Sequence, residues 1–394
     1  VFESKGLEEI AGLQILGRVD TVGAGDSMLA GIAAALAAGR DNVTAAALGN
    51  FVAGVTVQKL FQTGTATPEE ILDIGADPDY IYRPELAEDP RQARYALNTE
   101  FEIVTDLPRG ARFSHAIFDH DGTISTLRQG WEQIMEPVMI KAILGKKFQD
   151  ADESLYQKVV QRVREYIDKT TGIQTLAQME GLVELVREFG LVPSSLVQDA
   201  AGYKRIYNDA LMGLVRERIA KFERGELNVD DYTIKNSVEF LRALHKARLR
   251  LFLASGTDEQ DVIHEARALG YAGCFEGRIY GAVGRTDVEA KKVVLERILH
   301  DIGRDKAPNV ITFGDGPVEI RETHKRGGYA FGIASDEVRR FGVNRDKRAR
   351  LIRAGADMII PDYSQLNLLL KIIGAPGVRV REESSAAARR SRAQ

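Results

Sequence analysis

Short apolar runs alternate with amphipathic stretches over the second part of the chain, from about residue 113 to residue 373. Runs with the length of buried strands lie at 116–118, 249–254, 309–313, 329–333 and 358–360. Apolar residues at three- and four-residue spacings predict helices at about 258–269, 289–302 and 317–326. Such alternation predicts a parallel sheet with helices on both faces.

The stretch between the first and second of these strands is almost wholly helical in pattern, from about 124 to 244. A helical block of this size cannot be a simple crossover, so we expect a separate cap at about 127–240. Residues 113–373 are therefore expected to form an α/β domain with a Rossmann-like parallel sheet and an inserted α-helical cap.

The first part of the chain, residues 1–75, has a smaller α/β pattern. It contains a short strand pattern at 13–16, a glycine-rich turn at 20–26, helix patterns at 27–38 and about 43–60, and a short helix opening at Pro68. Residues 76–112 are richer in Pro, Asp, Glu and Arg and are interpreted as a linker. Residues 374–394 carry Ser, Ala and Arg, and we expect a disordered tail there.

Composition narrows the class of protein. The chain has 394 residues, a formal net charge of −4, and a single cysteine, Cys274. The charge balance gives no reason to expect nucleic acid as a partner, and no apolar run reaches the length of a membrane span. One thiol forms no internal disulfide, which is typical of the cytoplasm. The chain starts at Val1 inside an apparent domain, so we expect the true N-terminus to lie upstream. The oligomeric state stays open, with a homodimer among the options.

Two carboxylates follow the first strand of the second part, in residues 119–123 with the sequence Asp-His-Asp-Gly-Thr. Ligands of parallel sheets bind outside the carboxyl ends of the strands. Gly122 permits a sharp turn that aims Asp119 and Asp121 into one site. Asp119 can attack phosphorus, while Asp121 can protonate the leaving oxygen and later accept a proton from water.

Three further features lie at the ends of predicted elements. Ser255, with a free backbone N–H nearby, can bind a phosphate after the strand 249–254. Lys291 or Lys292 can neutralise the nucleophile and the phosphoryl group. Asp315 and Glu319, after the strand 309–313, can hold Mg²⁺, a hard cation that binds oxygen ligands.

The order and spacing of these four features resemble the haloacid dehalogenase (HAD) superfamily over about residues 113–370. The resemblance implies that Asp119 is the nucleophile, Asp121 the acid/base, and Ser255 the phosphate-binding hydroxyl. Lys291 is preferred over Lys292 because Leu295 fits the usual helix pattern, and Lys292 is kept as the alternative. The resemblance further implies Mg²⁺ bound by Asp119, Asp315 and the backbone carbonyl of Asp121, with Glu319 in support, where many relatives carry aspartate.

The presence of Asp121 narrows the reaction. Dehalogenating members of the family lack this second aspartate, so the resemblance implies a phosphomonoesterase or a phosphomutase. A helical insert between the first two motifs resembles the helical-cap class, which closes over small substrates. We therefore expect a phosphatase for a small phosphorylated sugar, polyol or glycolate-like acid, with a phosphomutase or a non-catalytic binding module as alternatives.

The glycine-rich turn at 20–26 is a second candidate site. The turn presents backbone N–H groups of Gly23, Ala24 and Gly25 at a helix start, where an anion can bind. Asp26 follows and could take a proton from an attacking hydroxyl. The turn resembles the C-terminal signature of ribokinase-family (PfkB-type) sugar kinases, and Asn50 resembles a residue lining their nucleotide pocket. The match covers only about residues 1–75, so ATP-dependent kinase activity is expected only from a longer protein, as a kinase–phosphatase fusion.

Charged residues elsewhere are expected to be structural. The mixed run at 344–350 is interpreted as an exposed helix face. Arg128 and Trp131 follow the nucleophile loop at the expected cap entrance, where substrate contact and a core or hinge role are both open. His120 lies between the two aspartates, and its side chain is expected to point away from the metal.

Overall fold

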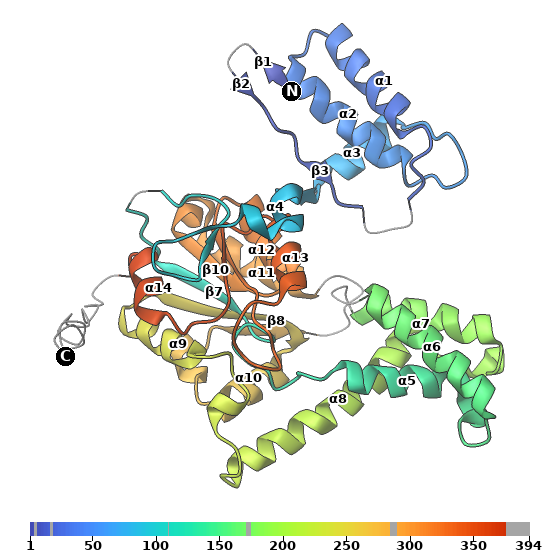
Figure 1. The fold of residues 1–394 in the computed structure, drawn as a ribbon, viewed down its shortest axis with the longest axis vertical. Coiled ribbons are helices and arrows are strands. Elements are labelled where there is room, and N and C mark those ends of the chain that lie inside the picture. The colour runs from blue at the N-terminus through green and yellow to red at the C-terminus, as the bar shows by residue number, and fades with distance from the viewer. Residues whose placement is uncertain (4–5, 16–18, 109, 171–174, 284–289, 376–394) are drawn as a thin grey trace, which may run out of the picture.

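The fold is that of a computed structural model, which describes residues 1–3, 6–15, 19–108, 110–170, 175–283 and 290–375. Figure 1 shows three parts: a small N-terminal lobe, a central sheet flanked by helices, and a helical cap. In the described part of the chain, no helix combines the length and the apolarity that crossing a membrane requires.

The centre of the molecule is an eight-stranded sheet with the order β5-β6-β12-β11-β10-β7-β8-β9. Strands β7 to β12 pair in parallel, whereas β5 and β6 are antiparallel. The bounds are β5 Arg94–Tyr95, β6 Glu102–Ile103, β7 His115–Asp119, β8 Arg250–Asp258, β9 Ile279–Ala282, β10 Val310–Gly314, β11 Tyr329–Ile333 and β12 Met358–Ile360. The predicted parallel sheet is confirmed, although the short strand β9 was not predicted.

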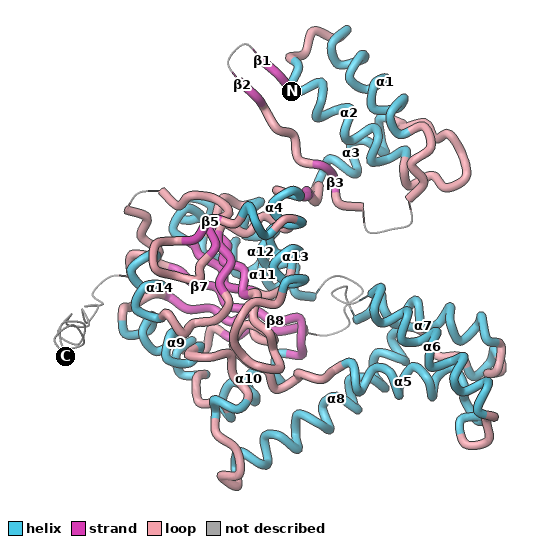
Figure 2. The backbone as a smooth tube through the Cα atoms, in the orientation of Figure 1, coloured by secondary structure: helices cyan, strands magenta, loops and turns pink. Residues whose placement is uncertain are grey.

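Helices cover both faces of the sheet, because successive strand residues point to opposite sides. On one face Phe118 packs in the apolar cluster that contains Phe240 of α9. On the other face Ile117 lies in a second apolar cluster, which contains Leu295 of α11. The flanking helices are α9 Ser237–Lys246, α10 Glu259–Ala268, α11 Ala290–Ile302, α12 Pro317–Lys325, α13 Arg345–Arg353 and α14 Leu366–Ile372. Figure 2 shows the strands enclosed between these helices.

Four helices form the cap: α5 Glu132–Leu144, α6 Glu153–Thr170, α7 Thr175–Phe189 and α8 Ala200–Glu223. The cap has an apolar core of its own, which includes Met139 and Leu182. Helix α8 connects the two cores: Leu211 lies in the cap core, and Ile219 further along the helix lies in the core under the sheet. Helix α8 therefore belongs to both the cap and the sheet domain.

The N-terminal lobe contains two long helices packed against each other, α1 Ala24–Ala37 and α2 Asn42–Thr56. Its other elements are β1 Phe2–Glu3, β2 Gly6–Leu7, β3 Gly12–Leu13, α3 Pro68–Ala76 and β4 Tyr80–Ile81. The strand expected at 13–16 is the two-residue strand β3, which pairs with β4. Helix α3 begins with a complete capping box between Thr67 and Glu70.

The segment interpreted as a linker, residues 76–112, differs from that expectation. It contains α4 Pro84–Glu88, and its strands β5 and β6 extend the central sheet. Phe101 is fully buried, and Glu102 forms a buried bidentate ion pair with Arg348. Strands of two residues are too short to show a periodic pattern, so partners distant in sequence place them in the sheet. The domain boundaries at 75 and 112 stay predictions, and most of the predicted tail, 376–394, lies outside the described residues.

Candidate active site

The first site loop follows β7, where the chain turns sharply back on itself. The backbone N–H groups of Ile124 and Ser125 both donate to the His120 carbonyl, and Gly122 N–H donates to Ser125 O at 2.8 Å. Gly122 has φ 71°, a left-handed conformation that favours glycine. A Cβ at Gly122 would lie 2.2 Å from Asp315 Oδ2. The glycine is therefore required both for the turn and for the close approach of the β10 loop.

Three carboxylates converge at this end of the sheet. Ligand oxygens of Asp119, Asp315 and Glu319 all lie within 4.8 Å of one another. Asp119 ends β7, Asp315 follows the adjacent strand β10, and Glu319 belongs to α12. Lys291 bridges two of them, with Nζ 2.9 Å from Asp119 Oδ2 and 2.7 Å from Glu319 Oε2. Oxygen donors in this number and spacing fit a hard divalent cation such as Mg²⁺.

Burial and charge act against each other on these groups. Burial raises the pKa of Asp119 well above its usual value, the Lys291 ammonium works against this rise, and Glu319 and Asp315 add to it. Burial would lower the pKa of Lys291, but the carboxylates of Asp119 and Glu319 outweigh it and hold that pKa above its ordinary value. The cluster is therefore short of positive charge, which a divalent cation would supply.

Lys347 is a second ammonium group in the site that sequence reasoning missed. Its Nζ lies 2.6 Å from Asp315 Oδ2 and 2.6 Å from Glu337 Oε1. Burial acts to raise the pKa of Asp315, but Lys347 and Lys291 outweigh it and hold the pKa of that carboxyl below its usual value. The interpretation of 344–350 as an exposed face is wrong at Lys347 and Arg348, which are 7% and 4% exposed. Most residues of this helix are charged, so its few apolar residues gave too weak a pattern to predict a buried face.

Asp121 lies beside the acidic cluster, with its own set of neighbours. Its Oδ2 accepts a hydrogen bond from Thr257 Oγ1 at 3.3 Å, and its Oδ1 lies 3.4 Å from Arg128 Nε. Its side-chain oxygens group with His120 and Glu265, and not with the Asp119 cluster. Asp121 thus has neighbours other than those of Asp119, and Thr257, at the end of the predicted strand 249–254, is one of them.

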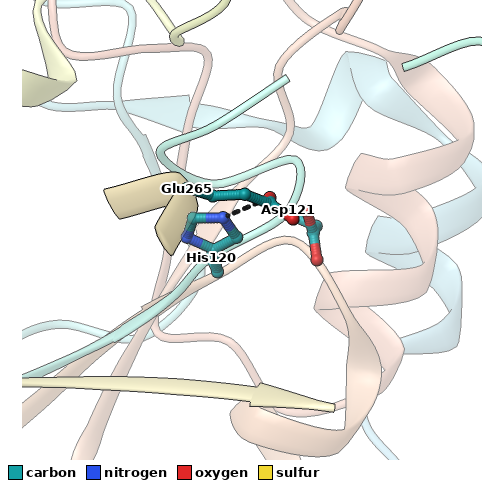
Figure 3. Close-up of side chains that lie close together, drawn as sticks. All are labelled: His120, Asp121 and Glu265. Atoms are coloured by element: carbon teal, nitrogen blue, oxygen red, sulfur yellow. Dashed lines mark hydrogen bonds and ion pairs between the residues drawn. The ribbon is translucent and has the colours of Figure 1, made fainter. Parts of the chain in front are cut away.

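His120 points away from the acidic cluster, as expected from the sequence. Its Nε2 lies 3.1 Å from Glu265 Oε2, and its Nδ1 lies 3.1 Å from the hydroxyl of Tyr271. Figure 3 shows the His120 ring joined to Glu265, with the Asp121 side chain beside them. His120 and Glu265 are both fully buried.

The two remaining predicted groups differ in their surroundings. Ser255 is 1% exposed, and it follows Ala254, the partner of Asp119 in the parallel register. Its Oγ accepts a hydrogen bond from the Thr257 N–H at 3.1 Å. Lys292 turns away from the cluster, because its Nζ pairs with Asp77 of the N-terminal lobe. The geometry therefore favours Lys291 as the site lysine.

The kinase-like turn opens α1. Gly23 precedes the helix with φ 79°, Ala24 and Gly25 form its first turn, and Asp26 is exposed in that turn. A Cβ at Gly23 would lie 2.8 Å from Thr63 Cγ2. Asn50 uses its side-chain amide to donate to Ala11 O at 2.8 Å. This bond fixes the segment before β3, so at least one donor of Asn50 serves the fold.

Comparisons with known proteins match both segments. The pfkB family carbohydrate kinase model matches residues 1–70, and the haloacid dehalogenase-like hydrolase model matches residues 113–322. The bifunctional protein HldE of Halorhodospira halophila (strain DSM 244 / SL1) is 44% identical over 84 residues, which are 20% of this chain and 17% of that protein. The chain thus spans about a sixth of the length of that curated relative.

Solved structures similar to this chain have low identity. A HAD family hydrolase from Deinococcus radiodurans R1, solved with bound phosphate and sodium, is 17% identical with a TM-score of 0.40, covering 68% of this chain and 100% of that one. A beta-phosphoglucomutase from Clostridium difficile is 12% identical with a TM-score of 0.42, covering 66% and 97%. The hydrolase model alone matches more than half of the sequence, in the same segment as the carboxylate cluster. This chain belongs to the haloacid dehalogenase-like hydrolase family, and it carries a pfkB-type segment in front of the hydrolase.

Proposed function

We propose that the chain is a magnesium-dependent phosphatase that hydrolyses a small phosphorylated metabolite through an aspartyl-phosphate on Asp119. The observation that supports it most is the convergence of Asp119, Asp315 and Glu319, with Lys291 between two of them. Asp119, Asp315 and the backbone carbonyl of Asp121 would hold Mg²⁺, with Glu319 in support. When bound, Mg²⁺ would neutralise charge on the transferring phosphoryl group and favour the ionised form of Asp119.

The reaction then has two steps, and Asp121 transfers one proton in each. In the first, an Asp119 oxygen forms a bond to phosphorus, the bond to the leaving oxygen breaks, and the Asp121 carboxyl donates its proton to that oxygen. Ser255 and Lys291 bind phosphoryl oxygens during this transfer. In the second, Asp121 takes a proton from water, the water oxygen attacks phosphorus, and the acyl-phosphate bond breaks to release inorganic phosphate and Asp119.

The substrate class follows from the neighbouring segment. Residues 1–70 match a carbohydrate kinase model, so we propose a sugar or polyol phosphate as substrate, ahead of a glycolate-like phosphate. A longer protein with this segment complete would add a sugar kinase that uses ATP, with Asp26 as the base. A hexose 1-phosphate separates the phosphatase from a phosphomutase, because the first releases free phosphate and the second yields an isomerised sugar phosphate.

The test of the proposal is the Asp119→Asn variant. Because an amide is a poor nucleophile, we expect release of phosphate from p-nitrophenyl phosphate to fall by about 10³-fold or more. Asp106→Asn is the matched control, since the Asp106 side chain is 74% exposed on the surface. EDTA should abolish wild-type activity, and Mg²⁺ should raise the melting temperature of the wild type. Activity of Asp119→Asn within threefold of wild type, about 0.65 kcal/mol in barrier, would remove Asp119 from the mechanism.

A further inference from the structure

Arg128 lies in the short segment that joins the nucleophile loop to the cap, and it contacts three separate parts of the molecule. Its Nε lies 3.4 Å from Asp121 Oδ1 in the site. One terminal nitrogen lies 2.6 Å from Glu265 Oε1 on α10, and it also lies 3.2 Å from Met212 Sδ on the cap helix α8. The Arg128 side chain is 15% exposed, so these contacts are largely shielded from water.

The contact with the sheet domain is the firmer one. Glu265 is fully buried and is held on its other oxygen by His120, which in turn contacts the Tyr271 hydroxyl. Burial would raise the pKa of Glu265, but its bonds to His120 and Arg128 outweigh burial and hold that pKa at about 2. Glu265 is therefore an ionised, rigid anchor for the guanidinium group.

The contact with Asp121 is looser. Arg128 Nε and Asp121 Oδ1 are both buried and have no hydrogen-bond partner within the described residues. They face each other at 3.4 Å, so a small rotation would turn the contact into a direct hydrogen bond. The other oxygen of Asp121 already accepts from Thr257. Together Arg128 and Thr257 define the direction of the Asp121 carboxyl.

Helix α8 holds the backbone on either side of Arg128, through a residue near Ile219 of the sheet-domain core. Arg218 of α8 donates to the carbonyl of Leu127 and, at 2.9 Å, to the carbonyl of Gln129. The guanidinium of Arg218 also stacks 4.7 Å from the centre of the Tyr232 ring. Because α8 carries residues of both the cap core and the sheet core, a shift of the cap along α8 would move residues 127–129.

We propose that Arg128 is a positioning residue that ties the orientation of the Asp121 carboxyl to the position of the cap. The inference rests on the proposed function, in which Asp121 protonates the leaving oxygen. With the cap in place, Arg128 stands between the Glu265 anchor and Asp121 and holds the acid toward the leaving group. With the cap displaced, the 127–129 backbone carries Arg128 away, and Asp121 loses one of its two orienting contacts.

A purely structural ion pair would behave differently. A buried Arg–Glu pair that only supports folding would affect every substrate equally when it is removed. A residue that positions the acid affects most the substrates whose leaving oxygen needs a proton. Phenyl phosphate has such a leaving group, whereas p-nitrophenolate leaves readily without protonation.

The experiment compares kcat/KM for these two substrates in wild type and Arg128→Gln, with Mg²⁺ present. We expect a loss of about 10- to 100-fold for phenyl phosphate and a loss below threefold for p-nitrophenyl phosphate. Asp121→Asn should show the same selective loss, more strongly. Arg164→Gln is the matched control, because it removes an exposed arginine–glutamate pair within the cap, between Arg164 of α6 and Glu136. The ratio of its kcat/KM values for the two substrates should equal that of wild type.

Arg128→Lys covers the case in which Arg128→Gln fails to fold. Lysine keeps the charge but cannot span two carboxylates, so the selective loss should persist at a smaller size. Equal losses for both substrates in a folded Arg128 variant would overturn the inference and leave Arg128 a structural residue. A wild type that hydrolyses neither substrate would instead remove the proposed function and this inference with it.

Discussion

The role of a side chain in this site depends more on its partners in space than on its chemical type. Lys291 and Lys292 are adjacent in sequence and equal in charge, yet one faces Asp119 and the other faces Asp77. Their directions differ because consecutive residues of a helix point about 100° apart. The same reasoning separates Asp119, among carboxylates, from Asp121, beside Thr257 and Arg128.

The lysine pair can be tested directly by two methionine variants. Lys291→Met leaves Asp119 and Glu319 without their shared countercharge, so we expect kcat to fall about 10²-fold or more. Lys292→Met should stay within about threefold of wild type, because Lys292 pairs on the surface with the N-terminal lobe. Steady-state phosphate release at saturating Mg²⁺ is the measurement, and equal losses in the two variants would contradict the assignment.

Asp357 offers a pH-dependent test of stability away from the site. It is 4% exposed, accepts a hydrogen bond from Ala330 N–H at 2.9 Å, and burial raises its pKa to about 6. Because the folded pKa lies above the unfolded value, the neutral form stabilises the fold at low pH, and this contribution is lost as the pH rises through about 6. Ionised Asp357 then costs on the order of 3 kcal/mol at pH 8.

Asp357→Asn keeps the hydrogen-bond acceptor and removes the charge. We expect its melting temperature to exceed that of wild type by several degrees at pH 8, and the difference to disappear at about pH 3.5, below the ordinary pKa of an aspartate. Asp150→Asn, on an exposed turn, should leave the melting temperature unchanged at both pH values. A stability difference that does not change with pH would show that the pKa of Asp357 is the same in the folded and unfolded states.

Elements bring the site together through the parallel register of the sheet. The pairing of β7 with β8 and β10 places the ends of these strands side by side, with Asp119 opposite Ala254. The loops that follow must then pass close to one another. Gly122 is a point of close approach between two loops, because a Cβ there would lie 2.2 Å from Asp315 Oδ2.

Gly122→Ala tests this approach of two loops. The variant carries the cost of a left-handed alanine, about 1–2 kcal/mol, and a clash with Asp315. Gly270→Ala is a matched control, since Gly270 has a similar φ of +75° with open space around its Cβ position. We expect a lower melting temperature in both variants, and a reduced stabilisation by Mg²⁺ only in Gly122→Ala. Equal stabilisation by Mg²⁺ in both would contradict a role of Gly122 in placing Asp315.

At the scale of the whole molecule, charged contacts join the lobe to the sheet domain. Asp77 and Asp79, in the turn between α3 and β4, pair with Lys292, Arg321 and Lys325 of α11 and α12. Ion pairs with Lys292 and Lys325 hold the pKa of Asp77 at about 2. Each ion pair of such a surface network contributes little to the free energy of unfolding. Because these pairs connect the lobe to the sheet domain, we expect them to affect the attachment of the lobe and not the stability of the sheet domain.

Neutralising this network should loosen the lobe. For the Asp77→Asn/Asp79→Asn double variant, we expect limited proteolysis between the lobe and the sheet domain to be roughly fivefold faster, which corresponds to about 1 kcal/mol. Phosphatase activity should be unchanged. Asp73→Asn, exposed on α3, is the control and should be cleaved at the wild-type rate. If the double variant is cleaved no faster, these ion pairs do not hold the lobe in place.

The sequence by itself determined the features that depend on neighbours along the chain. Periodicity predicted most of the core strands and helices, the parallel sheet and the helical insert, and the motif at 119–123 marked the end of β7. These features are local, because a strand or an amphipathic helix must show its pattern within a few turns or residues.

The tertiary structure alone decided which distant groups meet. It placed β5 and β6 in the sheet, directed Lys291 rather than Lys292 to Asp119, and brought Lys347 to Asp315. It also set Arg128 between Glu265 and Asp121, which lie more than a hundred residues apart. The physical reason is that the energy of a buried charge depends on its partners in space, and no local pattern of residues encodes which partners the folded chain provides.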